Sequence, residues 1–346
     1  MKSGEWRVES EEWRVKSGVI FSLFSKSTVS FFCRLVSGKK FEFSPAPLST
    51  PNSPLSKKGS VFMSKLTDIS YVKGILAKHG FTFSKALGQN FLINPSVCPK
   101  MAEMCGCNEN VGVIEIGPGA GVLTSELAKT AYKVIAVELD KRLLPVLAET
   151  LSEHDNVKVI NGDVMKLNLK ELIQEEFNGG EVVICANLPY YITSPVIMRI
   201  LEERLPINSL TVMVQKEAAE RICAAPGTRQ SGAISAAVHY YSEPEMLFKV
   251  SAGSFLPAPK VDSEVIKLNI LKNPPVRVTD EKMFFRVVKA AFMQRRKTAA
   301  NSLSAGLGMP KAEINALLEK SGIKPSARAE ELTMQDFAEI ADSISN

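Results

Sequence analysis

A glycine-rich turn is the first group of residues in this chain whose types and spacing suit ligand binding. The turn reads Glu115-Ile-Gly-Pro-Gly-Ala-Gly121; it follows a short apolar run and precedes a helical pattern. Glycines allow a tight turn, and they let the backbone approach a ligand without a Cβ atom in the way. The dinucleotide fingerprint GxGxxG would place its third glycine one residue later, where this chain has Val122. The turn alone therefore predicts a nucleoside site and leaves the kind of nucleoside open.

Two carboxylates extend this predicted site. Glu138 ends the second apolar run, where its side chain can accept hydrogen bonds from both hydroxyls of a ribose, and Asp163 ends the third run in Asn161-Gly-Asp-Val164. A nucleoside without phosphates, held by a glycine turn, a Glu and an Asp, favours S-adenosylmethionine (SAM) over NAD or FAD. The structural alternatives are that Glu138 is a solvated acid at a strand end and that Asp163 caps a turn or helix.

The tetrapeptide Asn187-Leu188-Pro189-Tyr190 ends the fourth apolar run and suits chemistry on an aromatic amine. The exocyclic amine of adenine is a poor nucleophile because its lone pair is delocalised into the ring. An Asn side-chain oxygen and a backbone carbonyl that accept its two N–H bonds would favour a pyramidal nitrogen, with the lone pair directed at a methyl sulfonium. Pro189 fixes the turn and removes a competing donor, and Tyr190 offers a stacking face for an unstacked base. A plain proline turn at a strand end is the alternative.

Apolar runs and helical patterns alternate from Val111 onward, which is typical of a doubly wound α/β domain whose sheet is covered on both faces. The predicted strands are residues 111–116, 133–139, 157–160, 181–187 and 210–215, followed by a pair at 246–250 and 264–270. The predicted helices between them are residues 124–131, 141–151, 169–177 and 194–203. Beyond Asn273-Pro-Pro275, three helical patterns at about 281–304, 310–321 and 333–344 predict a small all-α domain.

With these motifs in place, the chain resembles the dimethyladenosine transferases, the ribosomal RNA adenine N6,N6-dimethyltransferase family of the small subunit. Further blocks of the resemblance are Lys85-Ala-Leu-Gly-Gln-Asn-Phe-Leu92, Phe255-Leu-Pro-Ala-Pro-Lys-Val-Asp-Ser263, and Phe292-Met-Gln-Arg-Arg-Lys297 with Asn301. The resemblance implies a Rossmann-like SAM-dependent methyltransferase domain that contacts SAM through Asn90, Leu92, Gly117, Glu138, Asp163 and Asn187. It implies catalytic roles for Asn187, Leu188, Pro189, Tyr190 and Phe255, with Phe255 stacking on the target base opposite Tyr190.

The activity that the resemblance implies is transfer of methyl groups from SAM to N6 of two adjacent adenines in a hairpin loop near the 3′ end of 16S rRNA, as a step of ribosome biogenesis. The expected partner is the small-subunit rRNA within the immature 30S particle, and the expected protein is a cytoplasmic monomer without a metal. One rival is the related antibiotic-resistance methylase that acts on large-subunit rRNA, which should lack the FxxRRK helix. Another is an assembly or transcription factor that keeps the fold for binding alone, which the intact tetrapeptide disfavours.

The first 62 residues differ from the rest in composition. They hold both tryptophans, in the near-duplicate stretches GEWRVES and EEWRVKS, and their ten Lys/Arg and five Asp/Glu account for the whole net charge of +5. No period of 2 or 3.6 residues persists there, so we expect a disordered extension before a natural start at Met63. A basic, Ser-rich transit peptide for an organelle is the alternative.

The remaining chain, with balanced charge, is expected to divide into a methyltransferase domain at 63–272 and a helical RNA-binding domain at 273–346. The local basic residues of the second domain share a predicted helix and can neutralise phosphates: Arg295, Arg296 and Lys297, with Arg286 and Lys289. A solvated basic helix face is the alternative. The three histidines are scattered, so no metal site is expected. No run of about 18 apolar residues occurs, so no membrane span is expected either.

Overall fold

A computed structural model of the protein describes residues 65–84, 88–294 and 296–345. The expected extension at 1–62 therefore lies outside the described residues. The chain from Val61 to Asn346 forms one compact unit. None of the helices within the described ranges is long and apolar enough to cross a membrane.

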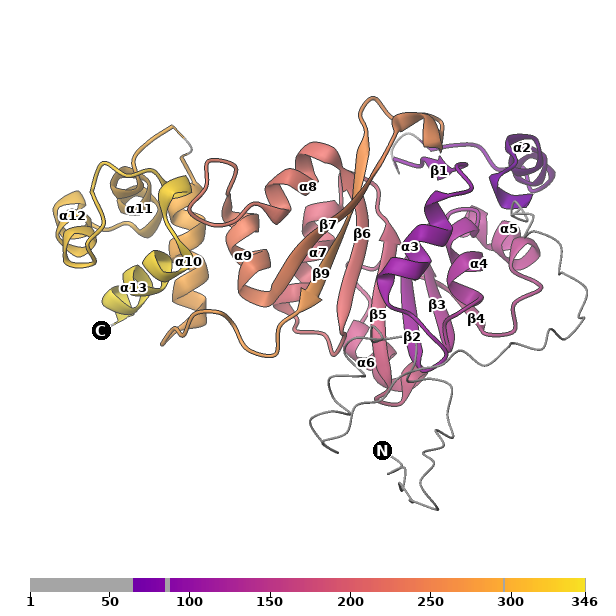
Figure 1. Ribbon diagram of the computed structural model, residues 1–346, viewed down its shortest axis with the longest axis horizontal. Helices are drawn as coiled ribbons and strands as arrows, with labels where there is room; N and C mark the ends of the chain where they lie inside the picture. The colour runs from indigo at the N-terminus through magenta and orange to yellow at the C-terminus, as the bar shows by residue number, and fades with distance from the viewer. Residues whose placement is uncertain (1–64, 85–87, 295, 346) are drawn as a thin grey trace, which may run out of the picture. The chain divides into compact units, whose positions relative to one another are not determined.

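A seven-stranded sheet forms the centre of this unit, with its strands in the order β4-β3-β2-β5-β6-β9-β7 (Figure 1). These strands are β2 (Val111–Ile116), β3 (Lys133–Glu138), β4 (Val157–Asn161), β5 (Glu181–Asn187), β6 (Ser209–Gln215), β7 (Ser242–Val250) and β9 (Ser263–Ile270). The first five strands of the order are parallel, whereas β9 pairs antiparallel with β6 and β7. Because the chain winds outward from β2 in both directions, the predicted doubly wound, Rossmann-like architecture is confirmed.

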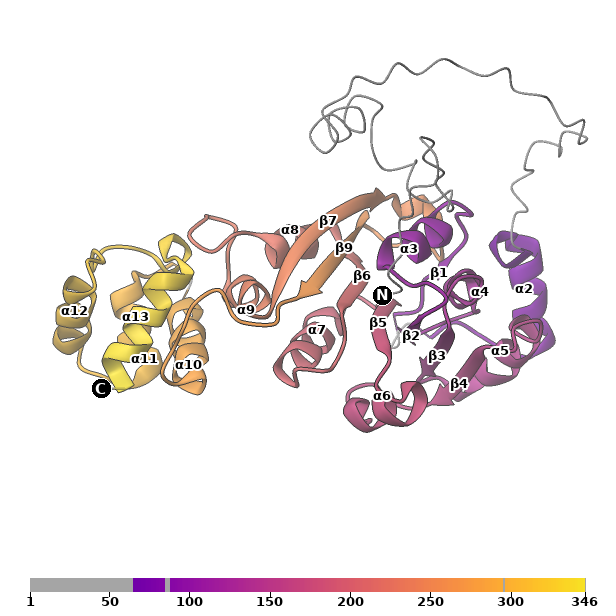
Figure 2. The ribbon, with the colours of Figure 1, turned by 60° about the horizontal axis from the view of Figure 1, so that its bottom comes forward.

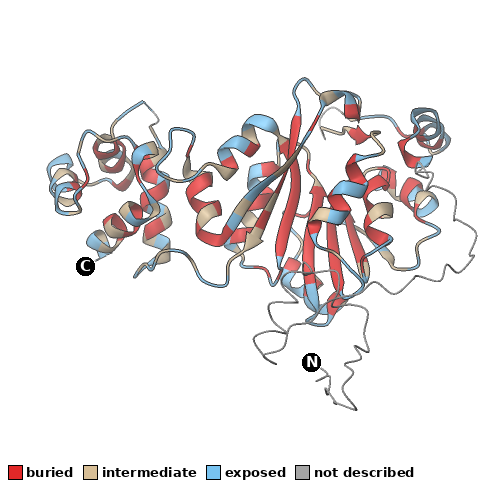
Figure 3. Ribbon diagram, viewed as in Figure 1, coloured by how far each residue is buried: buried red, intermediate tan, exposed pale blue. Residues whose placement is uncertain are grey.

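Helices cover both faces of the sheet, as the two views in Figures 1 and 2 show. They are α3 (Val97–Cys105), α4 (Val122–Ala128), α5 (Leu144–Thr150), α6 (Leu169–Phe177), α7 (Thr193–Glu202), α8 (Lys216–Cys223) and α9 (Ala233–Tyr241). A further helix, α2 (Ile69–Lys78), packs with α5 in a separate hydrophobic cluster. Successive residues of β2 point to opposite faces. Val113 packs in the cluster that includes α3 and α4, and Ile114 packs in the cluster that includes α6 and α7. Burial on both faces explains the unbroken apolar runs of the central strands β2, β3, β5 and β6, which are buried along most of their length (Figure 3). The edge strands β4 and β7 are mostly exposed or half-buried.

A second, two-stranded sheet joins segments that are far apart in the sequence. β1 (Phe91–Leu92) pairs antiparallel with β8 (Phe255–Leu256), so that Leu92 faces Phe255. This pairing brings two blocks of the family resemblance, the segment before α3 and the Phe255 segment, to one place.

Four helices, rather than the three predicted, follow the sheet: α10 (Glu281–Phe292), α11 (Ala299–Leu307), α12 (Lys311–Lys320) and α13 (Met334–Ser345). The prediction of one continuous helix over 281–304 is wrong. Thr298 has extended backbone angles, and its hydroxyl accepts a hydrogen bond from the Asn301 N–H at 3.4 Å. Since this side chain caps a new helix, α11 begins at Ala299 instead of continuing α10.

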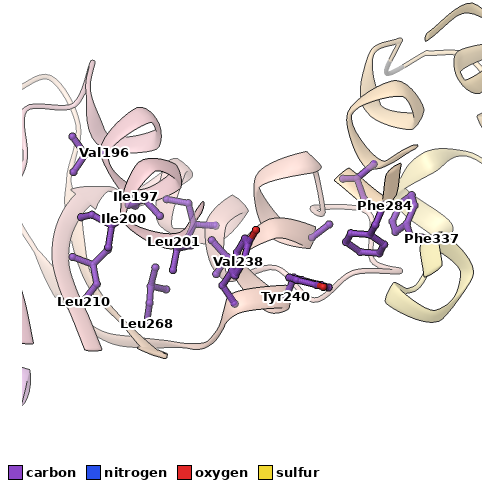
Figure 4. Close-up of a cluster of buried hydrophobic side chains, with 14 of the residues drawn as sticks. Val196, Ile197, Ile200, Leu201, Leu210, Val238, Tyr240, Leu268, Phe284 and Phe337 are labelled. Atoms are coloured by element: carbon purple, nitrogen blue, oxygen red, sulfur yellow. The ribbon is translucent and has the colours of Figure 1, made fainter. Parts of the chain in front are cut away.

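The C-terminal helices share a hydrophobic core with the sheet domain. At the junction the rings of Tyr240 in α9 and Phe284 in α10 lie 4.9 Å apart between centroids. Figure 4 shows the cluster running from Val196 on α7 and Leu210 on β6 to Phe284 and Phe337 among the C-terminal helices. Glu281 reinforces the junction, because its carboxylate accepts hydrogen bonds from the hydroxyls of both tyrosines of α9.

Candidate active site

A cavity of about 320 Å³ lies at the carboxyl ends of the parallel strands. In doubly wound sheets, ligands bind at this edge, where the strand order reverses. Its lining includes all ten residues that were predicted for cofactor binding or catalysis: Asn90, Leu92, Gly117, Glu138, Asp163, Asn187, Leu188, Pro189, Tyr190 and Phe255. The fold therefore brings the predicted residues together, while their individual roles stay predictions.

The glycine turn forms one wall of the cavity. Gly117, Gly119 and Gly121 all have positive φ angles, of 72°, 60° and 87°, which other L residues adopt only with strain. A Cβ on Gly119 would lie 3.2 Å from the ring of Phe91, so the turn also packs closely against β1. This wall needs glycine both for its backbone conformation and for the approach of the neighbouring strand.

Glu138, at the end of β3, is held in a fixed position beside this turn. Its carboxylate accepts hydrogen bonds from the N–H of Asp140 at 2.7 Å and from the N–H of Gly119 at 3.4 Å. The side chain is 6% exposed, and this burial raises the pKa of Glu138 above its ordinary value. Because it lines the cavity and bonds to the turn, it is not the solvated strand-end acid of the alternative interpretation.

The loop after Glu138 is tied to the segment before β1. Asp140 pairs with Arg142 at 2.7 Å and accepts a hydrogen bond from the Gln89 amide at 2.9 Å. The bond with Arg142 is the main cause that lowers the pKa of Asp140 to about 2. Gln89 also lines the cavity, so this ion pair fixes one side of it.

Asp163 caps a turn, as one of the two interpretations of the sequence has it, and it also lies in the wall of the cavity. One carboxylate oxygen accepts the N–H of Met165 at 2.9 Å, which is a turn cap, and the other lies 3.7 Å from the Lys166 ammonium. The residue nevertheless lines the cavity, about a third exposed. A ligand can therefore still reach the carboxylate, although one oxygen is committed to the turn.

The tetrapeptide after β5 presents polar groups that the protein leaves free. Among the described residues, none forms a hydrogen bond with the Asn187 side-chain amide or donates one to the Leu188 carbonyl oxygen. The Leu188 side chain is buried in the core at 1% exposure, so it anchors the turn. The two free oxygens are the acceptors that the predicted amine chemistry requires.

Two aromatic residues accompany these acceptors. The Tyr190 hydroxyl lies 2.8 Å from the hydroxyl of Ser263, which fixes the far end of its ring, and burial raises the pKa of this phenol. Phe255, 3% exposed, lines the same cavity from β8. Tyr191 also lines the cavity, with 56% of its surface exposed.

Comparison with known proteins agrees with this geometry. The family model described as ribosomal RNA adenine dimethylase matches residues 80–346. Several relatives carry the name ribosomal RNA small subunit methyltransferase A. The protein of Shouchella clausii is 49% identical, over 78% of this chain and 92% of its own length. The protein of Alkaliphilus oremlandii is 47% identical, over 82% of this chain and 99% of its own length. The chain belongs to the ribosomal RNA adenine dimethylase family.

Two solved structures of methyltransferases are similar to this chain. A dimethyladenosine transferase from Plasmodium falciparum is 25% identical, with a TM-score of 0.60, over 72% of this chain and 95% of its own. The 23S rRNA methyltransferase ErmE is 25% identical, with a TM-score of 0.57, over 74% of this chain and all of its own. Both support the methyltransferase fold.

Two of the basic residues predicted for RNA binding, Arg296 and Lys297, do not lie on the predicted helix. Arg296 and Lys297 lie in the connection between α10 and α11, and Arg295 is outside the described residues. They therefore do not share one helix with Arg286 and Lys289, because α10 ends at Phe292. Neither Arg296 nor Lys297 lines the cavity at the strand ends.

Sequence reasoning assigned no role to Glu115, the first residue of the glycine turn. This carboxyl is 1% exposed, lines the cavity, and has an oxygen with no hydrogen-bond partner among the described residues. Burial raises its pKa from 4.5 to about 8, so it is largely protonated at neutral pH. The signal was present in the sequence, because Glu115 is an ionisable residue inside an otherwise apolar strand.

Proposed function

We propose that this protein transfers methyl groups from SAM to N6 of two adjacent adenines in a hairpin loop near the 3′ end of 16S rRNA, within the immature 30S particle. The observation that carries the proposal is the pair of free acceptors at Asn187 and Leu188, which lie at the same cavity as the glycine turn and Glu138. Family membership and the small-subunit relatives support rRNA as the substrate. We further propose that it acts as a monomer in the cytoplasm.

The residues at the strand ends fit SAM. Glu138 would accept the ribose hydroxyls, Asp163 and Asn90 would contact the nucleoside, and the glycine turn would let the backbone lie against the ligand. The buried, unpartnered oxygen of Glu115 offers a further hydrogen-bonding group in the same cavity. When bound, SAM supplies an electrophilic methyl group on a sulfonium.

The chain's own contribution to the chemistry is to hold the adenine amine. Asn187 and the Leu188 carbonyl would each accept one N–H bond, which turns the nitrogen lone pair out of conjugation and toward the methyl group. Tyr190 and Phe255 would hold the flipped base by stacking, and the Tyr190–Ser263 hydrogen bond limits how far that ring can move. This arrangement needs neither a covalent intermediate nor a bound metal.

Replacing Asn187 with Ala tests the proposed role. We expect the single-turnover rate of methyl transfer to immature 30S particles to fall about 100-fold or more, the size expected for loss of one preorganised polar contact. Affinity for SAM, measured by calorimetry, should fall much less, so that the loss is mainly in the chemical step. A variant with a near-normal single-turnover rate would refute the role of Asn187.

A second candidate function, methylation of large-subunit rRNA, is favoured by the similarity to the 23S rRNA methyltransferase ErmE. The relatives at 49% and 47% identity are named for the small subunit, whereas that structure is 25% identical. Incubation of the protein with purified 16S and 23S rRNA and with both subunits discriminates between the two. Transfer of labelled methyl groups to large-subunit RNA alone would favour the second candidate.

A further inference from the structure

A second cavity, of about 260 Å³, lies between the helices that follow β6 and the C-terminal helices. None of the residues that line it lines the cavity at the strand ends. One side comes from Arg221 in α8 and from the start of α9; the other comes from Phe292 at the end of α10 and from Gln294 and Lys297 in the following connection. Its volume is near the lower end of the roughly 300–1,000 Å³ of small-ligand sites.

The charged side chains that line this cavity have a net positive charge. Arg221 and Lys297 contribute two cations, and Glu330 contributes one carboxylate. Arg221 forms one long ion pair, of 4.0 Å, with the exposed Glu217 of its own helix. Within the described ranges, Lys297 and Glu330 form no ion pair. The two cations are therefore available to an anion that enters the cavity.

Backbone N–H groups at the start of α9 also favour an anion in this cavity. The N-cap is Gly232, which has no side chain to cap the helix, and no described residue accepts a hydrogen bond from the N–H of Ala233 or of Ile234. Both of these residues line the cavity. Free N–H groups and the positive end of a helix dipole favour an anion at this place.

The remaining wall is apolar. Phe292 and Ile234 are half-buried and line the cavity together, and Gln294 adds an amide that can donate and accept hydrogen bonds. A site with cations and free N–H groups beside an aromatic ring and an amide matches the chemistry of one nucleotide, with a phosphate and a base.

We infer that this cavity binds a single nucleotide of the substrate RNA, with its phosphate at Arg221, Lys297 and the start of α9 and its base against Phe292. The inference rests on the proposed function, because the RNA is taken to be the small-subunit rRNA. It adds to the active site a second contact, formed jointly by the sheet domain and the C-terminal helices, which would position the RNA while the target adenine is methylated.

A pair of substitutions at Gly232 tests the charge of this site without weakening the fold. A Cβ on Gly232 would meet only Arg221 Cδ, at 4.0 Å, and the backbone there is extended, so a side chain fits. Both Gly232→Asp and Gly232→Asn should cap α9 and keep or raise the thermal stability. Only Asp places a negative charge at the proposed phosphate position.

The measurement is filter binding of the full chain to immature 30S particles over a salt series. We expect Gly232→Asp to bind about threefold to tenfold more weakly than Gly232→Asn at low salt, with a flatter salt dependence, because fewer counterions are released. Arg221→Gln should also bind more weakly, whereas Lys216→Gln, at a similarly exposed position on the same helix, should bind as wild type does.

Equal affinity and equal salt slope for the Asp and Asn variants would overturn the inference. A titration with free AMP distinguishes the source of the nucleotide: if Arg221 is needed for AMP binding but not for binding to 30S particles, the cavity is a free-nucleotide site and the inference is wrong. Failure of the proposed function has a different signature, since wild-type protein would then not methylate 30S particles at all.

Discussion

At the scale of single residues, the proposed chemistry depends on buried and half-buried polar groups at the strand ends that lack a full set of partners. Glu115, Asn187 and the Leu188 carbonyl all line the cavity and keep unused hydrogen-bonding capacity. A buried polar group without a partner destabilises a fold, so such groups indicate a ligand site.

The carboxylate of Glu138 should determine the affinity for SAM. We expect Glu138→Ala to weaken SAM binding by roughly 1–3 kcal/mol, the cost of losing hydrogen bonds to a charged acceptor. Calorimetric titration measures this directly, and Glu175→Gln on the exposed side of α6 is the matched control. Unchanged SAM affinity in Glu138→Ala, or tight binding of NADH to the wild type, would contradict the cofactor assignment.

The buried carboxyl of Glu115 should make stability depend on pH in the SAM-free protein. Its pKa is raised from 4.5 to about 8 in the folded state, so the folded protein binds more protons than the unfolded chain between these values. The free energy of unfolding contributed by this residue therefore falls as the pH rises through that window. Glu115→Gln removes this titration. The free energy of unfolding of the variant, relative to that of the wild type, should therefore rise by up to about 4–5 kcal/mol from pH 4.5 to pH 8.

Urea denaturation of both proteins at a series of pH values checks this prediction, because titrating groups that do not interact with Glu115 cancel in the difference. A difference in unfolding free energy that stays constant from pH 4.5 to pH 8 would show that Glu115 does not titrate abnormally.

At the scale of secondary structure, most strands of the central sheet were predictable, whereas several helix ends, the start of β7 and the short strands β1 and β8 were not. The predicted strand of residues 111–116 matches β2, because a strand buried on both faces is apolar throughout. The predicted helix of residues 169–177 matches α6, because a helix buried on one face has apolar residues at helical spacing. The break between α10 and α11 depends on one capping hydroxyl, that of Thr298, which local periodicity does not reveal. The helix start at residue 124 was also placed late, since α4 begins at Val122 directly after the glycine turn.

The members of the candidate site were predictable for a similar reason. The carboxyl ends of parallel strands meet at one edge, so motifs at those ends come together. The second cavity was not predictable, because it joins Arg221 to Lys297 across a junction that depends on the packing of α9 against α10.

Close packing of α10 against α11 should depend on Gly306. A Cβ at this position would lie 2.6 Å from Ala290 Cβ and 2.8 Å from Ala290 Cα, and the backbone of α10 cannot move easily. Gly306→Ala should therefore destabilise the protein by about 1–3 kcal/mol, although Ala favours a helix by about 1 kcal/mol. Gly74→Ala, inside α2 with nothing within 4 Å, is the control and should stabilise slightly in the same denaturation experiment. Equal effects of the two substitutions would contradict the close packing of these helices.

At the scale of the whole molecule, the cavity at the strand ends can recognise one adenine, but it cannot select that adenine within a ribosomal subunit. Selection must come from contacts outside that cavity, and the C-terminal helices, which share a core with the sheet domain, are positioned to supply them. Arg296, Lys297 and the second cavity lie on that side of the chain. Binding energy from these remote contacts would hold the RNA for reaction at the strand ends, so free adenosine should be a negligible substrate.

The most direct test starts from immature 30S particles of a strain that lacks its own dimethyltransferase. The particles are incubated with the protein and SAM, and mass spectrometry then identifies the methylated nucleotides of the 16S rRNA. We expect two adjacent N6,N6-dimethyladenines in one hairpin loop near the 3′ end. With the Asn187→Ala variant under single-turnover conditions, they should form at least about 100-fold more slowly than with the wild type. Methyl groups on 23S rRNA, or an unmodified 16S rRNA after incubation with active, SAM-binding protein, would contradict the proposed function.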